Sequence, residues 1–334
     1  MIKATFFTQK FFMGNRQFSV TDEANRDDCL YGFFLLKEML KKENIDLSTQ
    51  DINPPSESRF IIYNEMPKSK YIYKNKNTYL LLFESELIRP DNWDVGKHVD
   101  FEKIFTWNDE FVDHHKYFKM NFPNRINLLP DNFSIERKKK LCTMIAGHKY
   151  KSHPLELYSE RLKTIRWFEK NHPADFDLYG IGWGEYPVGK SYIINYIKSM
   201  LKIAKPVFPS YKGMIGSKKE ILPDYKFAIC YENARNITGY ITEKIFDCFF
   251  SGCVPIYWGE PNIGEDIPTN AFICRNDFET HEALYSYITN MSQEDYESYL
   301  QAISDFLKSK KAYPFSAENF AETICREVLK DLEI

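Results

Sequence analysis

The sequence predicts an α/β protein made of two Rossmann-like domains that face each other across a cleft. Three observations support this fold class. The chain has 334 residues, more than the roughly 250 to 300 at which a single hydrophobic core stops growing. Short apolar runs alternate with amphipathic helical segments in both halves. Between the halves, residues 123–134 are rich in Asn and Pro and lack periodicity, which is typical of a linker.

The first half contains apolar runs of strand length and one clear amphipathic helix. The expected strands cover residues 2–7, 60–63, 79–83 and 104–107. The helix is expected to begin near Asp27, a residue type that caps helix N-termini. Its apolar stripe contains Leu30, Phe33, Phe34, Met39 and Leu40.

The second half restarts the same alternation of strands and helices. The expected strands cover residues 141–145, 176–180, 225–233, 254–258 and 271–274, with helices over 154–170, from Thr242 onward, and towards residue 334. We therefore expect an N-terminal domain over residues 1–133, a C-terminal domain over 134–315 and a C-terminal helix over 316–334. Parallel α/β sheets bind ligands at the carboxyl ends of their strands, so the residues just after Phe83, Tyr231 and Trp258 are the first candidates for chemistry.

Composition excludes some partners and compartments. A formal net charge of -3 gives no basic field that would attract nucleic acid. The seven cysteines are scattered without C-x-x-C spacing, which predicts reduced, buried thiols in a cytoplasmic protein. No apolar run approaches the roughly 20 residues of a membrane-spanning helix. We expect a soluble chain, with peripheral contact to a membrane left open.

The segment of residues 225–262 carries the most chemical information. It reads as a strand, a polar loop, a helix with Thr242 as N-cap and Gly252 as C-terminal glycine, and a second strand. The helix N-terminus points back to the end of the first strand, where its free N–H groups and Lys244 would suit a diphosphate. From spacing alone, an ordinary charged first turn explains these residues equally well. Polar side chains expected to converge there are Glu232, Asn233, Tyr240 and Glu243.

YKFAICYEN followed by GYITEKIFDCFFSGCVPIYWG resembles the donor-binding motif of family 10 glycosyltransferases, the α-1,3/1,4-fucosyltransferases. The resemblance is clear over residues 225–272 and suggests a soluble member of the bacterial type. It implies a GT-B fold, GDP-β-L-fucose as donor substrate and an acceptor glycan bound mainly by the N-terminal domain. It also implies donor contacts from the residues that match the motif, and from an arginine at a similar place in the family. These residues are Glu232, Asn233, Tyr240, Thr242, Glu243, Lys244 and Arg161.

The chain departs from the family pattern in two places. The loop ARNITG is about one residue longer than in bacterial members. Family members also place an arginine on the diphosphate, upstream of the YKF strand, whereas the interval from Lys202 to Glu220 contains no arginine here. A lysine gives charge without the bidentate fork of arginine, so the phosphate contacts cannot be carried over directly. Candidate replacements are Lys205, Lys212, Lys218, Lys219 and Arg235.

Inverting transfer needs a carboxylate that takes the proton from the acceptor hydroxyl, across the cleft from the donor. TYLLLFESELIRP places Glu84 and Glu86 directly after an apolar strand of the first half. Family members carry a Glu-x-Glu pair after the equivalent strand and use the first Glu as base, so the resemblance points to Glu84. Asp94 and Glu65 are weaker candidates.

Asp175-Phe-Asp177 is a D-x-D tripeptide of the kind that holds manganese in other nucleotide-sugar transferases. No further histidine or carboxylate follows closely enough to complete an oxygen-rich shell, so we expect no metal site and no obligatory cofactor. Three alternatives remain open: a transferase that uses another GDP-sugar, a nucleotide-sugar binding protein without turnover, and an NAD(P)-dependent enzyme. The last is disfavoured because no G-x-G-x-x-G follows an early strand.

Overall fold

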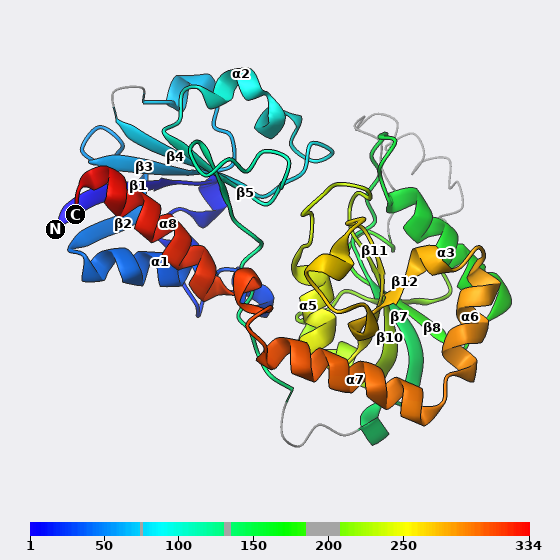
Figure 1. The fold of residues 1–334 in the computed structure, drawn as a ribbon. Coiled ribbons are helices and arrows are strands. Elements are labelled where there is room, and N and C mark those ends of the chain that lie inside the picture. The colour runs from blue at the N-terminus through cyan, green and yellow to red at the C-terminus, as the bar shows by residue number, and fades with distance from the viewer. Residues whose placement is uncertain (74–75, 130–134, 185–207) are drawn as a thin grey trace.

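The computed structural model describes residues 1–73, 76–129, 135–184 and 208–334. Within these residues the chain forms two six-stranded parallel sheets, each with its own helices (Figure 1). The first sheet has the order β2-β1-β3-β4-β5-β6. Its strands are β1 (Ile2–Phe7), β2 (Ile45–Thr49), β3 (Phe60–Asn64), β4 (Asn77–Leu82), β5 (Lys103–Thr106) and β6 (Tyr117–Lys119), and its helices are α1 (Tyr31–Lys42) and α2 (Val95–His98).

The second sheet has the order β12-β11-β10-β7-β8-β9. Its strands are β7 (Lys140–Ile145), β8 (Phe176–Tyr179), β9 (Tyr211–Gly213), β10 (Tyr225–Tyr231), β11 (Val254–Trp258) and β12 (Ile273–Cys274). Its helices are α3 (Tyr158–Asn171), α5 (Glu243–Phe250), α6 (His281–Asn290) and α7 (Gln293–Lys308). A large apolar core of aromatic and aliphatic side chains, distinct from that of the first sheet, surrounds this sheet.

Each sheet has one point at which the strand order reverses. In the first sheet, β1 lies between β2 and β3, and in the second, β7 and β10 are neighbours although β8 and β9 intervene in sequence. Loops leave such a point in opposite directions and open a crevice at the carboxyl ends of the strands. The fold therefore provides one crevice per sheet.

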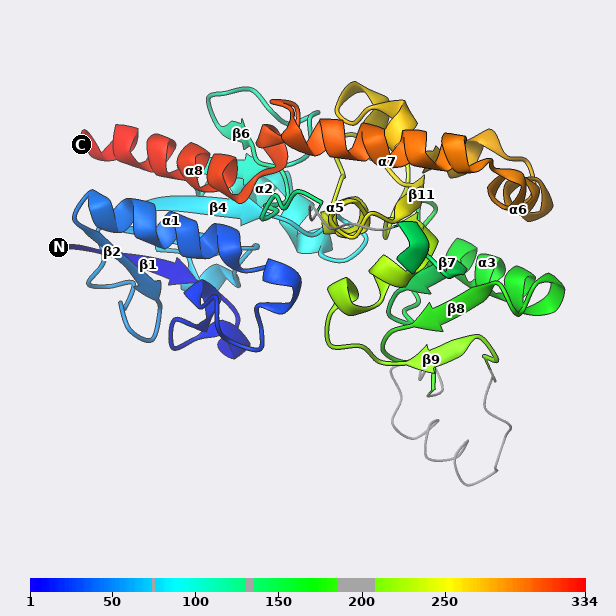
Figure 2. The same ribbon diagram turned by 90° about the horizontal axis from the view of Figure 1, so that it is seen from below.

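The last helix, α8 (Ala317–Leu332), returns to the first half of the molecule. It follows α7 of the second half directly in sequence but packs along α1 (Figures 1 and 2). The rings of Phe33 and Phe320 lie 5.4 Å apart in an edge-to-face contact. Lys103 of β5 reaches Asp331 of α8 at 2.6 Å. The chain thus crosses between the halves twice, and its C-terminal helix completes the first core.

The sequence missed three short strands and placed two helix starts too early, those of α1 and of α3, which begins at Tyr158 and not near Pro154. β2 has five residues, and β6 and β9 have three each, too few for a clear alternating pattern. Asp27 does not cap α1, which begins at Tyr31. Its φ of 55° is left-handed, whereas an N-cap is normally extended. Of the expected linker, residues 123–129 contain no helix or strand, and residues 130–134 lie outside the described part of the chain.

The seven cysteines are all free thiols, but Cys29 is exposed and Cys274 is partly exposed, which corrects the expectation that all of them are buried. Among the described residues, no helix combines the length and the apolar character needed to cross a bilayer.

Candidate functional site

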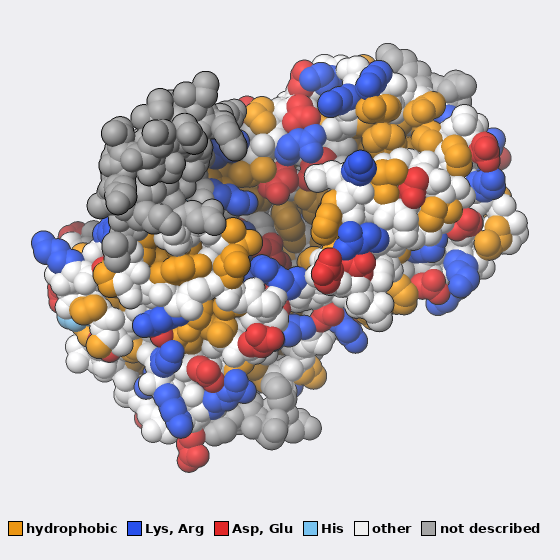
Figure 3. All heavy atoms as spheres, turned by 180° about the vertical axis from the view of Figure 1, so that it is seen from behind, with side chains coloured by type: hydrophobic (Ala, Val, Ile, Leu, Met, Phe, Trp, Pro, Cys, Tyr) orange, Lys and Arg blue, Asp and Glu red, His pale blue; other side chains and the backbone are white. Residues whose placement is uncertain are grey.

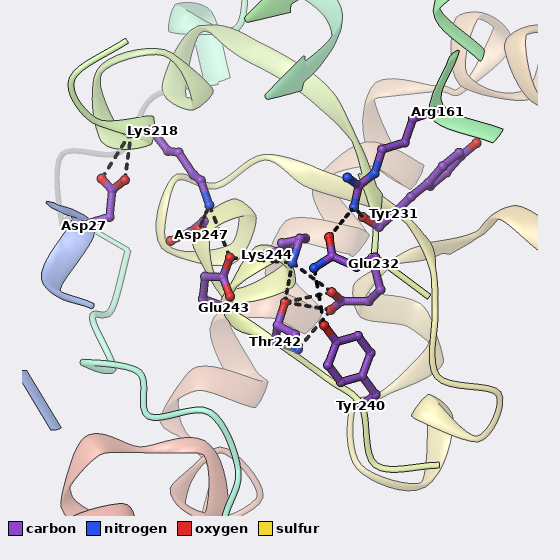
Figure 4. A network of polar contacts seen from close by, with 11 residues as sticks. Asp27, Arg161, Lys218, Tyr231, Glu232, Tyr240, Thr242, Glu243, Lys244 and Asp247 are labelled. Carbon is purple, nitrogen blue, oxygen red and sulfur yellow. Dashed lines mark hydrogen bonds and ion pairs between the residues drawn. The ribbon is translucent and has the colours of Figure 1, made fainter. Parts of the chain in front are cut away.

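Glu232 links the end of β10 to the start of α5. It follows β10 directly, and its side chain is fully buried. Its carboxylate accepts hydrogen bonds from the Thr242 backbone N–H at 2.9 Å and from the Thr242 hydroxyl at 2.8 Å. Lys244 donates to the same carboxylate at 3.0 Å (Figure 4). Thr242 occupies the expected N-cap position, but its hydroxyl binds Glu232 rather than a helix N–H. The strand end and the helix N-terminus are therefore rigidly joined.

Two lysines surround Glu243 in the first turn of α5. Lys244 Nζ lies 3.7 Å and Lys218 Nζ 3.8 Å from the Glu243 carboxylate. Burial pushes the pKa of Glu243 upward, but the two ammonium groups outweigh it and hold the pKa at about 2. Burial alone would lower the pKa of Lys244, yet Glu232 and Glu243 raise it above its ordinary value. Glu243, Lys244 and Lys218 are thus all charged at neutral pH.

Arg161 of α3 fixes the other side of the loop after β10. The arginine is 5% exposed and donates to the Tyr231 carbonyl at 2.6 Å and to Asn233 Oδ1 at 3.1 Å. Asn233 Nδ2 donates to the Tyr240 hydroxyl at 3.5 Å. The Tyr240 ring packs against Trp107 of the first half, with ring centres 4.7 Å apart. The predicted donor residues therefore form a network of two hydrogen-bonded groups, which the backbone of residues 231–233 joins. Through Tyr240 the network also contacts the first half.

This network borders a cavity of about 500 Å³, here called the β10 cavity, which is lined by the loops after β7 and β10. It lies at the crevice of the second sheet. From behind, the molecular surface is hollowed between the two halves, with charged side chains nearby (Figure 3). Of the predicted donor residues, the cavity is lined by Arg161, Asn233, Tyr240, Thr242, Glu243 and Lys244. Glu232 lies behind them.

A second cavity, of about 610 Å³, opens at the crevice of the first sheet. We call it the β1 cavity because it is lined by the segment after β1, together with the ends of β3 and β4. Its walls combine the aromatic rings of Phe12, Phe33 and Phe83 with charged side chains. Glu84 lines both cavities.

Glu84 is half-buried, and the loop that carries it is firmly held. Its backbone N–H donates to Glu65 at 2.9 Å, and its carbonyl accepts from Trp93 Nε1 at 3.0 Å and from Asn92 Nδ2 at 3.2 Å. Burial raises the pKa of the Glu84 carboxyl, while Lys244 and Lys149 act in the opposite direction. A carboxylate of raised pKa at the junction of two cavities is suited to general-base work.

The other carboxylates considered as base are placed differently. Glu86 is exposed and lines neither cavity. Asp94 is exposed and pairs with Lys97 at 2.9 Å. Glu65 lines the β1 cavity but uses its carboxylate to hold the backbone of Glu84.

The structure also distinguishes between the candidate replacements for the diphosphate-binding arginine by their positions. Lys218 lines both cavities. Lys212 pairs with Asp177 at 3.3 Å and Lys219 with Asp28 at 2.6 Å. Arg235 stacks over the Trp258 ring at 5.3 Å, and Lys205 lies outside the described residues. Of the candidates that the structure describes, Lys218 is the one at the cavity.

Sequence reasoning missed four ionisable residues of the β10 cavity: Arg26, His148, Lys149 and Asp247 of α5. His148 and Lys149 follow β7, so the rule that ligands bind after parallel strands could have identified them. Arg26 lies far beyond the end of β1 and carries no local signal.

The two aspartates of the D-x-D tripeptide contact protein partners. Asp175 accepts a hydrogen bond from Tyr285 at 2.7 Å, and Asp177 pairs with Lys140 at 2.8 Å. Elsewhere in the described ranges, no three His, Cys, Asp or Glu side chains gather as a metal-binding group.

Short stretches of the chain are similar to curated fucosyltransferases. The chain is 40% identical over 74 residues to the α-(1,3)-fucosyltransferase FucT of Helicobacter pylori, which covers 22% of this chain and 15% of the relative. It is 40% identical over 83 residues to α-(1,3)-fucosyltransferase B of Drosophila melanogaster, with 24% and 18% covered. It is 38% identical over 89 residues to GDP-fucose protein O-fucosyltransferase 3 of Gallus gallus, with 26% and 18% covered. The matches thus span less than a fifth of each relative.

Solved structures share the whole architecture at low sequence identity. An α1,3-fucosyltransferase crystallised with GDP-fucose superposes with a TM-score of 0.53 and 16% identity, covering 97% of this chain and 90% of the other. An α-glucosyltransferase in complex with UDP-glucose and DNA reaches a TM-score of 0.58 at 10% identity, with 99% of both chains covered. These neighbours show the predicted GT-B fold.

Residues 135–332 match the model of glycosyltransferase family 10 (fucosyltransferase), C-terminal part. The match contains β7 to β12 and α8, and with them every predicted donor residue. Because it covers more than half of the chain, the protein belongs to glycosyltransferase family 10, the fucosyltransferases.

Proposed function

We propose that the protein transfers L-fucose from GDP-β-L-fucose to a hydroxyl of an acceptor glycan with inversion at the anomeric carbon. The donor occupies the β10 cavity and the acceptor the β1 cavity. The observation that carries this proposal is that Glu84 lines both cavities. A base at their junction can reach the acceptor hydroxyl while facing the donor sugar.

The donor diphosphate is placed at the N-terminus of α5. Lys244 and Lys218 supply positive charge there, and the helix end adds its partial charge. Asn233, Tyr240 and Glu243 offer donors and acceptors to the sugar and ribose hydroxyls.

Two predicted donor residues take supporting roles in this proposal. Glu232 is fully buried and does not line the cavity, so it positions Thr242 and Lys244 rather than contacting the donor. Arg161 lines the cavity, but its guanidinium is committed to Tyr231 and Asn233. We assign it chiefly to holding the loop after β10.

In the reaction, Glu84 accepts the proton of the acceptor hydroxyl as that oxygen forms a bond to C1 of fucose. The bond from C1 to the β-phosphate oxygen breaks on the opposite face, and GDP leaves with the electron pair. Lys244 and Lys218 stabilise the charge that develops on the leaving diphosphate. These cations take the part that a divalent metal plays in other transferases, so the proposed reaction needs no metal.

Product analysis tests this function. The protein is incubated with GDP-fucose labelled in the sugar, with N-acetyllactosamine as a glycan acceptor and with water alone, and products are examined by NMR. An α-linked fucoside, or release of α-fucose to water, supports inverting transfer. A β-linked product contradicts inversion. Preferred use of GDP-mannose would favour another GDP-sugar, and donor binding without any turnover would favour a binding protein. A cytoplasmic location stays a prediction from the sequence.

A further inference from the structure

We propose that the turn Arg26–Asp28 of the first half is a clamp that completes the diphosphate site: Arg26 binds the diphosphate, and Asp27 positions Lys218 beside it. This inference rests on the proposed placement of the donor in the β10 cavity. Family members bind the diphosphate with an arginine that this chain lacks upstream of the YKF strand. We assign that role to Arg26 of the first half and Lys218 of the second half.

The clamp is built from contacts between the halves. Asp27 accepts a hydrogen bond from the Ser217 hydroxyl. It also accepts from the Lys218 backbone N–H, at 3.2 and 3.3 Å to its two oxygens (Figure 4). Asp28 pairs with Lys219 Nζ at 2.6 Å. Asp27 and Asp28 of the first half thus bind residues 217–219 of the second half.

The backbone of the clamp is unusual. Asp27 and Asp28 have φ values of 55° and 63°, both in the left-handed region. Such residues cost free energy and persist only where surrounding contacts enforce them, often at ligand sites. Here the contacts to residues 217–219 hold the turn from the second half, and Arg125 adds an ion pair of 3.6 Å to Asp28.

The clamp holds Lys218 at the β10 cavity. With its N–H bound to Asp27, Lys218 directs its ammonium group to Asp247, and it lies 3.8 Å from Glu243 in the first turn of α5. An ammonium group has three donors, so one remains for a phosphate oxygen.

Arg26 from the same turn lines both the β10 and the β1 cavity. Its side chain is exposed and makes no hydrogen bond or ion pair with the part of the chain that the structure describes. An unpaired arginine at a phosphate site can use its fork for a bidentate contact.

Charge balance shows why these two cations matter. The β10 cavity is lined by three carboxylates, those of Glu84, Glu243 and Asp247. It is also lined by five cations, namely Arg26, Lys149, Arg161, Lys218 and Lys244. Without Arg26 and Lys218, cations and carboxylates would be equal in number, and a dianionic diphosphate would meet no net positive charge. Arg26 and Lys218 therefore give the lining of the β10 cavity its net positive charge.

Calorimetric titration with GDP and with guanosine tests the inference. Arg26→Ala should lower GDP affinity by about 10- to 100-fold, the range for a lost contact to a charged group, and leave guanosine affinity unchanged. Asp27→Gly tolerates the left-handed backbone and removes the carboxylate, so it should also weaken GDP selectively. In an Arg26→Ala/Lys218→Ala background, Asp27→Gly should have little further effect, because Asp27 acts through those residues.

The matched control is Lys212→Ala, which removes a nearby lysine that pairs with Asp177 and does not line the β10 cavity. GDP affinity within twofold of the wild type for both Arg26→Ala and Asp27→Gly would overturn the clamp. Equal losses for guanosine and GDP would also overturn it, because they would indicate a general structural effect. If the wild-type protein does not bind GDP at all, the proposed donor itself is wrong. If Lys244→Ala weakens GDP binding and the Arg26 and Asp27 variants do not, the proposed donor site stands and the clamp is wrong.

Discussion

The Glu65 carboxylate accepts a hydrogen bond of 2.9 Å from the backbone N–H of Glu84, so one buried carboxyl group holds the loop that presents another. The same oxygen lies 3.3 Å from the Phe83 backbone nitrogen, and Asn92 donates to the other oxygen. Glu65 itself has a left-handed φ of 72° and is 8% exposed. Burial raises its pKa to about 7, although the Glu84 N–H and Asn92 favour the charged form.

This raised pKa predicts a pH-dependent stability. Between the ordinary glutamate pKa of about 4.3 and about 7, the folded protein binds more protons at Glu65 than the unfolded chain does. The free energy of unfolding should therefore fall as pH rises through this window, by up to roughly 3 kcal/mol from this group. Glu65→Gln cannot ionise and should lack this component. Urea unfolding of both proteins from pH 5 to pH 8 measures the difference, and parallel pH profiles would contradict it.

Glu84→Gln should reduce turnover while sparing donor binding. Glutamine keeps the shape of the side chain but cannot accept the proton, so kcat should fall by about 10²- to 10⁴-fold. GDP-fucose affinity should change little. Glu86→Gln is the matched control, because Glu86 is exposed and lines neither cavity. Equal, small effects of the two substitutions would mean that the base lies elsewhere.

Lys244→Ala should destabilise the fold as well as the donor site. It leaves the fully buried Glu232 carboxylate without its ammonium partner at 3.0 Å. Removing one partner of a buried ion pair costs about 3–5 kcal/mol. Adding Glu232→Gln should recover part of this loss, because the glutamine carries no charge. Lys163→Ala, which breaks an exposed pair with Glu160, should change the free energy of unfolding by less than ~1 kcal/mol. Failure of the double variant to recover stability would argue against an uncompensated charge.

Chelation should leave most of the activity intact. Lys244 and Lys218 line the β10 cavity, and in the proposed reaction they neutralise the diphosphate in place of a metal. Turnover of GDP-fucose in EDTA should therefore stay close to that in buffer alone. Loss of turnover that manganese restores would revive the assignment of Asp175 and Asp177 as metal ligands.

The sequence predicted the parts of the site that depend on local pattern. β4 and β10 are strong apolar runs, so the positions of Glu84 and Glu232 after them could be predicted from the chain alone. The N-cap position of Thr242 and the left-handed Gly252, with φ 57°, follow from short-range rules in the same way.

Features that depend on distant partners could not be predicted. The residue type and position of Asp27 predict a helix cap. Its partners, Ser217 and Lys218, lie about 190 residues away and leave no local pattern in the sequence. The return of α8 to α1 depends on tertiary packing of an amphipathic face, which does not specify its partner. Arg26 lines the β10 cavity, and its turn is held by contacts of Asp27 and Asp28 with residues 217–219, which are distant in sequence.

The choice of nucleotide tests the central claim most directly, because the same two-sheet fold occurs in structures with UDP-glucose and with GDP-fucose. Thermal unfolding is measured with GDP, GDP-fucose, UDP and UDP-glucose, each over the same 100-fold range of ligand concentration. A ligand at about 100 times its Kd stabilises the folded state by roughly 2.7 kcal/mol. We predict that GDP and GDP-fucose raise Tm progressively while UDP and UDP-glucose leave it unchanged. Equal shifts with the uridine nucleotides, or no shift with GDP-fucose, would contradict the assignment of this protein as a GDP-fucose-dependent transferase.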